Sequence, residues 1–196
     1  MDGQAGYYIA TRKERLVLIA NVLFTLSVIT NLGVDENLHE TARGYEGGKP
    51  FPLYVSPIHQ KGADGAPLFL SAAAADKFRD MTAAAARDGF YLKVTSAYRT
   101  YRHQLRLKRK KGNFAARPGW STHQQGSSID ICGTTRTING KKRRTILYWW
   151  MVRNGKKFGF YNDVDGELWH WTYVDGPAPK KRKRSKTSAA KQRDYI

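Results

Sequence analysis

The chain changes composition twice, and these changes restrict a packed domain to its middle part. Residues 178–196 contain five consecutive cations, Lys180 to Arg184, followed by polar residues, and cannot bury enough apolar surface to fold alone. Residues 1–50 contain an uncharged stretch, Leu16 to Val34. We therefore expect a folded domain over residues 51–177, between an N-terminal extension, 1–50, and a basic tail, 178–196.

The stretch 16–34 is expected to form an apolar helix that acts as an anchor or a docking segment. Its length, with cations before it and Asp35 and Glu36 after it, suits a membrane span whose C-terminal side lies outside. Asparagine, serine, threonine and glycine residues dilute it, so burial against the protein or a partner is favoured over a span. No small-residue cleavage site follows it, which argues against a cleaved signal peptide.

Charge and cysteine content limit the partners and the kind of metal site. The formal net charge of +18 implies a polyanionic partner or surface, either nucleic acid or an anionic cell envelope, and the tail could bind either one. The single cysteine, Cys132, excludes a disulfide framework and a cysteine-based zinc finger. A metal site in this chain must therefore use histidines and carboxylates.

Short strands and helices without a βαβ rhythm predict an α+β domain. Alanine-rich residues 72–86, with Ser71 as a possible cap and Gly89 as the stop, predict one helix. Further helices are expected at 100–111 and 145–157. Strands are expected at 90–96, 128–132 and 168–174, where β-branched or aromatic residues gather.

Two short stretches carry the residues of a hydrolytic metal site. His123 and Asp130 lie seven residues apart with Gly126 between them, and Glu167 precedes His170 by three residues. A catalytic zinc takes three imidazole or carboxylate ligands, and a carboxylate that is not a ligand must accept a proton from the attacking water. Glu167 is expected in the Asp165-Gly166 bend, and Gly126 is expected to let its loop turn toward the ion.

These stretches resemble the D-alanyl-D-alanine carboxypeptidases of the vancomycin-resistance type, which belong to the LAS metallopeptidases. That family carries S-x-H-x-x-G-x-A-x-D and then E-x-W-H. This chain has matching residues throughout except Ser128, which replaces the usual alanine. The stretch Ser96 to Gln104 is similar to the family's S-G-Y-R-S-Y-x-x-Q, and the three blocks keep the family's order.

The resemblance implies a small antiparallel sheet with surrounding helices and a zinc groove. It implies Zn²⁺ held by His123, Asp130 and His170, with Glu167 as general base. Arg99 is expected to bind a substrate carboxylate or a developing oxyanion, with Gln104 and Ser121 as lesser substrate-binding residues. The expected reaction is hydrolysis of a stem-peptide bond in bacterial peptidoglycan, by a D,D-carboxypeptidase or an L-Ala-D-Glu-type endopeptidase.

The setting and the rival functions stay open at this point. A phage virion enzyme that docks on virion or tail proteins is preferred, followed by a phage lysis enzyme and by a bacterial membrane-anchored, extracytoplasmic carboxypeptidase. A non-catalytic zinc-stabilised binding module and a nucleic-acid-binding protein are the alternatives outside the enzyme class. Glu167 and Arg99 favour an enzyme over the binding module. A nucleic-acid-binding protein would explain the charge but would leave the three motif blocks unexplained.

The remaining aromatic and acidic residues are assigned simpler roles. Trp120 is expected at the rim of the cleft. The other tryptophans of the domain are expected to pack in the core. Asp163 and Asp165 resemble part of a calcium loop but lack its spacing, so no role is assigned to them.

Overall fold

Antiparallel strands, most of them short, and α-helices of 9 to 16 residues make up the part of the chain that the computed structural model describes, residues 39–62 and 64–182. The α-helices are α2 (Ala72–Arg87), α3 (Tyr101–Lys111) and α4 (Ile146–Asn154), and the 3-10 turns are η1 (Gly112–Phe114), η2 (Thr122–Gln125) and η3 (Gly155–Phe158). The strands are β1 (Glu40–Glu46), β2 (Lys49–Lys61), β3 (Pro67–Ser71), β4 (Val94–Ser96), β5 (Ser128–Ile131), β6 (Thr135–Ile138), β7 (Lys141–Arg144), β8 (Phe160–Tyr161) and β9 (His170–Tyr173).

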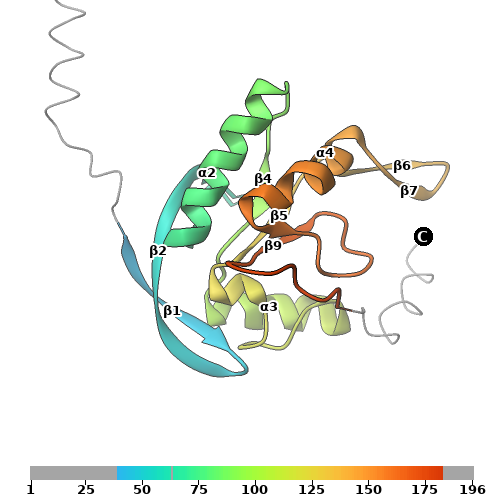
Figure 1. Cartoon of the computed structure of the whole chain (residues 1–196). Coiled ribbons are helices and arrows are strands. Elements are labelled where there is room, and N and C mark those ends of the chain that lie inside the picture. Colours follow the sequence, from blue (N-terminus) through green and yellow to red (C-terminus); the bar gives the residue numbers. More distant parts are fainter. Residues whose placement is uncertain (1–38, 63, 183–196) are drawn as a thin grey trace, which may run out of the picture. The chain divides into compact units, whose positions relative to one another are not determined.

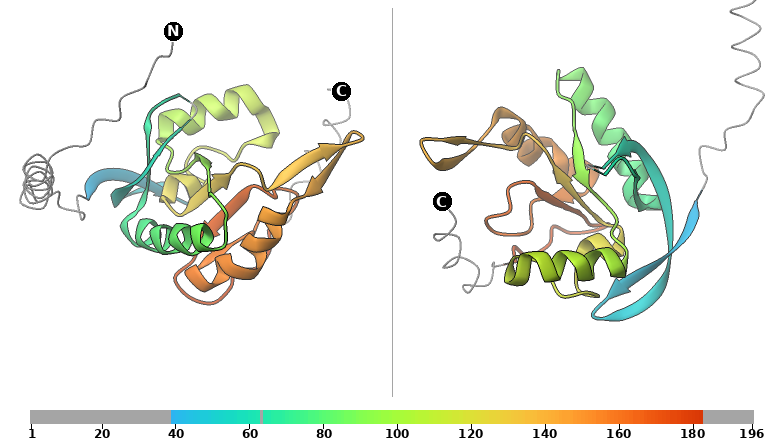
Figure 2. Two further views of the ribbon diagram at one scale, coloured as in Figure 1. Left: turned by 90° about the horizontal axis from the view of Figure 1, so that it is seen from above. Right: turned by 180° about the vertical axis from the view of Figure 1, so that it is seen from behind.

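The strands form a three-stranded sheet, β1-β2-β3, a four-stranded sheet, β4-β5-β9-β8, and the two-stranded hairpin β6-β7. All pairings within these sheets are antiparallel. We call the four-stranded sheet β4-β5-β9-β8 the central sheet. In Figure 1, α2 lies beside the long strand β2, α3 lies on the opposite side of the central sheet, and the β6-β7 hairpin projects outward. Figure 2 shows the same separation of α2 and α3 from two further sides. The α+β prediction is confirmed.

The hydrophobic core lies between α2 and the central sheet. The apolar side of α2 repeats at helical spacing, with Ala74, Phe78, Met81 and Ala85 all buried. From the sheet side, β5 contributes Ile129 and Ile131, and β8 and β9 contribute Phe160 and Trp171. This core fixes β5 and β9, which carry two of the expected ligands.

The predicted elements occur, but several are shorter than expected; the strand expected at 168–174, for example, spans only His170–Tyr173. The expected strand 90–96 is reduced to Val94–Ser96, of which only Val94 and Ser96 pair with β5, with a register shift between these two pairs. The expected helix 145–157 is α-helical only to Asn154 and then tightens into a 3-10 turn. Ser71 occupies the N-cap position of α2, but its side chain makes no capping hydrogen bond.

The limits of the folded part also differ from the expected ones. The expected boundary at residue 50 falls inside the β1-β2 hairpin, and the folded unit begins at His39. The stretch 16–34 lies outside the described residues. Among residues 39–62 and 64–182, no helix has the length and apolar character needed to cross a membrane. The tail also begins later than expected, because Arg182 pairs with Val164 in an isolated parallel bridge.

Candidate active site

The loop that carries His123 is held by segments that precede it in the sequence. The backbone N–H of Gly48, at the tip of the β1-β2 hairpin, donates to the Gly119 carbonyl over 2.9 Å. The Arg99 N–H donates to the His123 carbonyl over 3.0 Å. The side chain of Gln124 is fully buried and accepts from the Gly119 N–H over 2.7 Å. His123 is therefore placed by a loop with little freedom to move.

Gly126 ends this loop for a reason other than the expected one. Its φ of +69° lies in the left-handed region, and its carbonyl accepts from the Ser71 N–H over 2.8 Å. A Cβ at this position would lie only 2.8 Å from the Ser71 nitrogen. The glycine thus permits close approach to the start of α2, rather than turning its backbone toward an ion.

Asp130 and His170 are brought together by strand pairing. They are directly opposite each other in the antiparallel register of β5 and β9. Directly paired residues in such a ladder project from the same face of the sheet. The Oδ1 of Asp130 lies 3.2 Å from His170 Nδ1 and 3.3 Å from His123 Nε2. One ligand atom from each of the three residues can be chosen so that all lie within 4.8 Å of one another.

The hydrogen bonds of the two imidazoles determine which ring nitrogens face the site. His123 Nδ1 lies 2.7 Å from the Ala97 carbonyl, which can only accept, so this nitrogen carries the proton. Thr172 Oγ1 donates to the Asp163 carboxylate and therefore accepts from His170 Nε2, which lies 3.1 Å away. Both rings then present an unprotonated nitrogen to the site.

The site is therefore three acceptor atoms without a donor among the described residues. His123 Nε2 and His170 Nδ1 lie 3.2 Å apart, and the third acceptor is an Asp130 oxygen. Burial lowers the pKa of His123 to about 4, so the ring is neutral at pH 7. Burial alone would raise the pKa of Asp130, but the charge of the neighbouring Arg99 guanidinium acts against burial, and the pKa lies well below its usual range. Two neutral imidazoles and one carboxylate are a donor set that fits Zn²⁺.

Arg99 supports this carboxylate from the other side. Its Nη2 lies 2.6 Å from Asp130 Oδ2, and its Nε donates to Ser96 Oγ over 2.8 Å. Burial lowers the pKa of Arg99, and the nearby Asp130 and Glu167 charges oppose this shift. Asp130 can therefore direct one oxygen toward the histidines while the other is bound by a guanidinium, which is a common way to orient a ligand.

Glu167 lies in a loop between turns, before β9 begins, as expected from the Asp165-Gly166 bend. Its backbone carbonyl accepts from Asn162 Nδ2 over 2.8 Å and from the His170 N–H over 3.0 Å. The same Asn162 amide nitrogen donates to the His170 carbonyl. This arrangement fixes the backbone of Glu167 relative to His170.

A cavity of about 300 Å³ joins these groups. Its lining includes the three acceptor residues together with Arg99, Glu167, Gln104, Ser121, Trp120, Trp169 and Arg182. Gln104 is almost fully buried, with Nε2 bound to the Ala116 carbonyl and Oε1 without a hydrogen-bond partner. The structure thus brings every sequence-predicted site residue to one cavity. Their chemical roles remain predictions.

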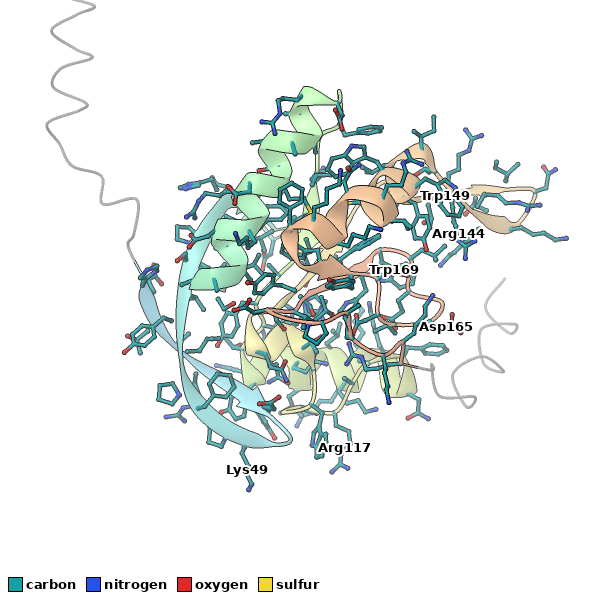
Figure 3. All side chains as sticks on the ribbon, in the orientation of Figure 1. Lys49, Arg117, Arg144, Trp149, Asp165 and Trp169 are labelled. Atoms are coloured by element: carbon teal, nitrogen blue, oxygen red, sulfur yellow. The ribbon has the colours of Figure 1, made fainter. Side chains whose placement is uncertain are left out.

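The tryptophans are divided between the core and the surface near the cavity. Trp150 and Trp171 are buried as expected, whereas Trp120 is 55% exposed at the cavity. Trp149 is 46% exposed, so its expected core position is wrong. Figure 3 shows Arg144, Trp149 and Trp169 on the side of the molecule where the β6-β7 hairpin joins α4.

Sequence reasoning missed the residues behind the histidines. Thr172 and Asp163 form the contact to His170, and Arg182 pairs with Asp163 over 2.6 Å. The period of two in β9 could have indicated Thr172, because it places residues 170 and 172 on one face. Asp163 had been set aside because it lacked calcium-loop spacing, and no local pattern linked it to the tail.

Comparison with known proteins decides the family. The family model for VanY-type D-alanyl-D-alanine carboxypeptidase matches residues 67–176, more than half of the chain. The chain belongs to the VanY family. Its three acceptor residues, Arg99 and Glu167 all fall within this match, whereas β1, β2 and Arg182 lie outside it.

Similar proteins within this family and fold are known. A putative carboxypeptidase of Bacillus subtilis (strain 168), YodJ, is 31% identical over 128 residues, which are 55% of this chain and 47% of that protein. A D-alanyl-D-alanine carboxypeptidase of Enterococcus faecalis (strain ATCC 700802 / V583) is 28% identical over 124 residues, with 49% and 45% covered. The chain therefore spans about half the length of these curated relatives. A solved structure of VanYB with D-alanine-D-alanine is 23% identical, with a TM-score of 0.49 over 66% of this chain and 84% of that one.

Proposed function

We propose that this VanY-family chain is a zinc-dependent peptidase that hydrolyses the stem peptide of bacterial peptidoglycan. The observation that carries the proposal is the convergence of three acceptor atoms, one each from His123, Asp130 and His170, all of which lie within the family-matched segment. The names of the two curated relatives, both carboxypeptidases, support the peptide substrate.

The chain's own groups can perform the proton transfers of peptide hydrolysis. A zinc ion held by the three residues would supply Lewis acidity to the scissile carbonyl and to the attacking water. Glu167 would accept the proton of that water and then donate it to the leaving amine. It fits this role because it lines the same cavity as the three acceptors and is not one of them.

Arg99 is proposed to have two functions. It orients Asp130 through the 2.6 Å contact, and its N–H groups that do not bond Ser96 or Asp130 can bind an anionic group of the substrate. Gln104 and Ser121 are proposed as lesser contacts to the substrate peptide, because both line the cavity. The unpartnered Oε1 of Gln104 can accept a hydrogen bond from a peptide N–H.

Within this function, removal of a terminal D-alanine is favoured over cleavage inside the stem. Both curated relatives are named as carboxypeptidases, which supports removal of a terminal residue, and the name of one of them specifies D-alanyl-D-alanine. The test is digestion of purified peptidoglycan, with the products resolved by mass spectrometry. Release of free alanine supports a carboxypeptidase, whereas a new amino terminus within the stem supports the L-Ala-D-Glu-type endopeptidase. Intact muropeptides after incubation with the zinc-loaded protein would contradict both.

For the biological setting, we prefer a phage virion enzyme, with a lysis enzyme as the second choice. The net charge of +18 and the segments outside the family match support docking on a larger anionic or protein assembly. The test is to look for this chain among the proteins of purified virions. Its presence only in lysing cells would support the lysis role. A bacterial chromosomal origin with envelope localisation would contradict both.

A further inference from the structure

The last described residues lie alongside the loop that carries Glu167. The Arg182 N–H donates to the Asp163 carbonyl over 2.7 Å, and the Arg182 carbonyl accepts from the Asp165 N–H over 3.0 Å. These bonds flank the parallel bridge between Val164 and Arg182. In Figure 1 the red end of the described chain runs back beside the loop before β9. A segment beyond the family match, which ends at residue 176, thus packs on the candidate site.

The Arg182 side chain provides the charge partner of a buried carboxylate. Asp163 is only 5% exposed, and its Oδ2 lies 2.6 Å from Arg182 Nη2. Its Oδ1 accepts from the Thr172 hydroxyl over 2.7 Å. A buried carboxylate is unfavourable unless it is paired and hydrogen-bonded. Arg182 is the lysine or arginine that pairs with Asp163 within residues 39–62 and 64–182.

These contacts continue to one of the acceptor residues. Thr172 gives its proton to Asp163 and so must accept from His170 Nε2, which leaves His170 Nδ1 unprotonated toward the site. The order of contacts is Arg182, Asp163, Thr172 and His170. Groups that orient a metal-binding histidine through its second nitrogen usually affect metal affinity by about 10–100-fold.

We propose that Arg182 is a positioning residue of the active site. It holds residues 162–167 against the cavity through its backbone, and its side chain holds the Asp163 carboxylate in the position where it accepts from Thr172, which in turn orients His170. The term active site in this inference rests on the proposed function, whereas the expected effects on the loop and on metal affinity do not. The segment 180–182 therefore belongs to the catalytic domain rather than to a separate tail.

The test compares full-length Arg182→Ala and Arg182→Lys with wild type. The matched control is Lys181→Ala, because Lys181 pairs with Asp165 at 4.0 Å and both of these side chains are more than half exposed. Zinc affinity is measured by competition with a chromophoric chelator. Amide exchange over residues 162–170 is measured by mass spectrometry on the zinc-free protein, with exchange in α2 as the check on overall folding.

For Arg182→Ala we expect zinc affinity to fall by about 10–100-fold and amide exchange over 162–167 to accelerate on the order of 10-fold, since local opening becomes easier. Arg182→Lys should recover part of both effects because it retains the charge, and Lys181→Ala should resemble wild type. If Arg182→Ala unfolds α2 as well, Arg182→Gln replaces it under the same criteria.

Wild-type zinc affinity together with wild-type exchange in the folded alanine or glutamine variant would overturn the proposal. Equal effects of Lys181→Ala and Arg182→Ala would also overturn it, because general charge would then be the cause. Both readouts are independent of hydrolysis. A protein that shows the loop and affinity effects but cleaves no peptidoglycan would contradict the proposed function and leave this inference standing.

Discussion

The loop around His123 and the loop around Glu167 line one cavity, yet different parts of the chain hold them. The first is fixed by the β1-β2 hairpin, by Ser71 and by Arg99, all of which precede it. The second is held by Asn162 and by Arg182, near the end of the described chain. The groups proposed to bind metal and the group proposed to move protons therefore have separate supports, so mutations should affect them separately.

The largest expected effect follows removal of an acceptor residue. Replacing His123, Asp130 or His170 with alanine should reduce bound zinc from about one ion per chain to almost none, since two ligands rarely retain the ion. Metal analysis after dialysis measures this. The control is His103→Ala, which removes an exposed histidine outside the group. Full zinc occupancy in the His170→Ala protein would show that this residue is not a ligand.

A smaller but still large effect is expected at the Glu167 loop. Glu167→Gln should keep zinc and the fold but lower the hydrolysis rate by about 10²–10⁴-fold, because an amide cannot accept the proton. Rates on a soluble stem peptide and zinc content are measured together. Asp165→Asn, which changes an exposed carboxylate of the same loop, serves as control. A Gln variant with the wild-type rate would exclude Glu167 as the base.

The support of the His123 loop can be tested with two glycines that share one backbone geometry. Gly126 and Gly140 both have a φ of +69°, but a Cβ at Gly140 meets nothing within 4 Å. Gly140→Ala should lower the free energy of unfolding by about 1–2 kcal/mol, the cost of the left-handed conformation. Gly126→Ala should lose about 1–3 kcal/mol more, because its methyl group collides with Ser71. Denaturant titrations measure both, and equal losses would mean that the contact with Ser71 relaxes freely.

The smallest effect is expected beyond the Glu167 loop. Removing residues 183–196 should leave hydrolysis of a small soluble peptide nearly unchanged, since it retains Arg182 and the contacts that Arg182 makes with this loop. Binding to intact sacculi should weaken, most of all at low salt, where screening of the tail's charge is weakest. Removal of 178–196 should be more harmful because it takes Arg182 as well. Identical rates of peptide hydrolysis for the two truncated proteins would show that Arg182 does not support the Glu167 loop.

Sequence reasoning identified the site better than it identified the supports of the site. The acceptor residues and Glu167 lie in short motifs, so local spacing was enough to bring His123, Asp130, His170 and Glu167 to attention. The two strands that carry Asp130 and His170 were expected, but their direct pairing was learned from the structure. The helices 72–87 and 101–111 agreed closely with expectation because alanine content, capping and glycine stops are local signals.

The missed features depend on contacts between distant parts of the chain. The β1-β2 hairpin crosses the boundary expected at residue 50. It is held by pairing between its two strands and by a hydrogen bond to Gly119, and composition alone does not reveal these contacts. The pairing of Arg182 with Asp163 could not be read from a run of cations, in which each residue has the same local pattern. Trp149 was placed in the core because large aromatic side chains usually pack there, and this general tendency does not separate it from its buried neighbour Trp150.

The span of the contacts around the candidate site has a consequence for the order of folding. His123 and His170 are 47 residues apart in sequence, and the Tyr98 hydroxyl bonds the Arg43 carbonyl 55 residues away. Forming such contacts requires large chain loops to close, which slows folding compared with local contacts. α2 and α3 can form first from local interactions, whereas the three acceptor atoms converge only when β5 has paired with β9. Zinc should therefore bind a chain that is already largely folded, so it would slow unfolding more than it accelerates folding.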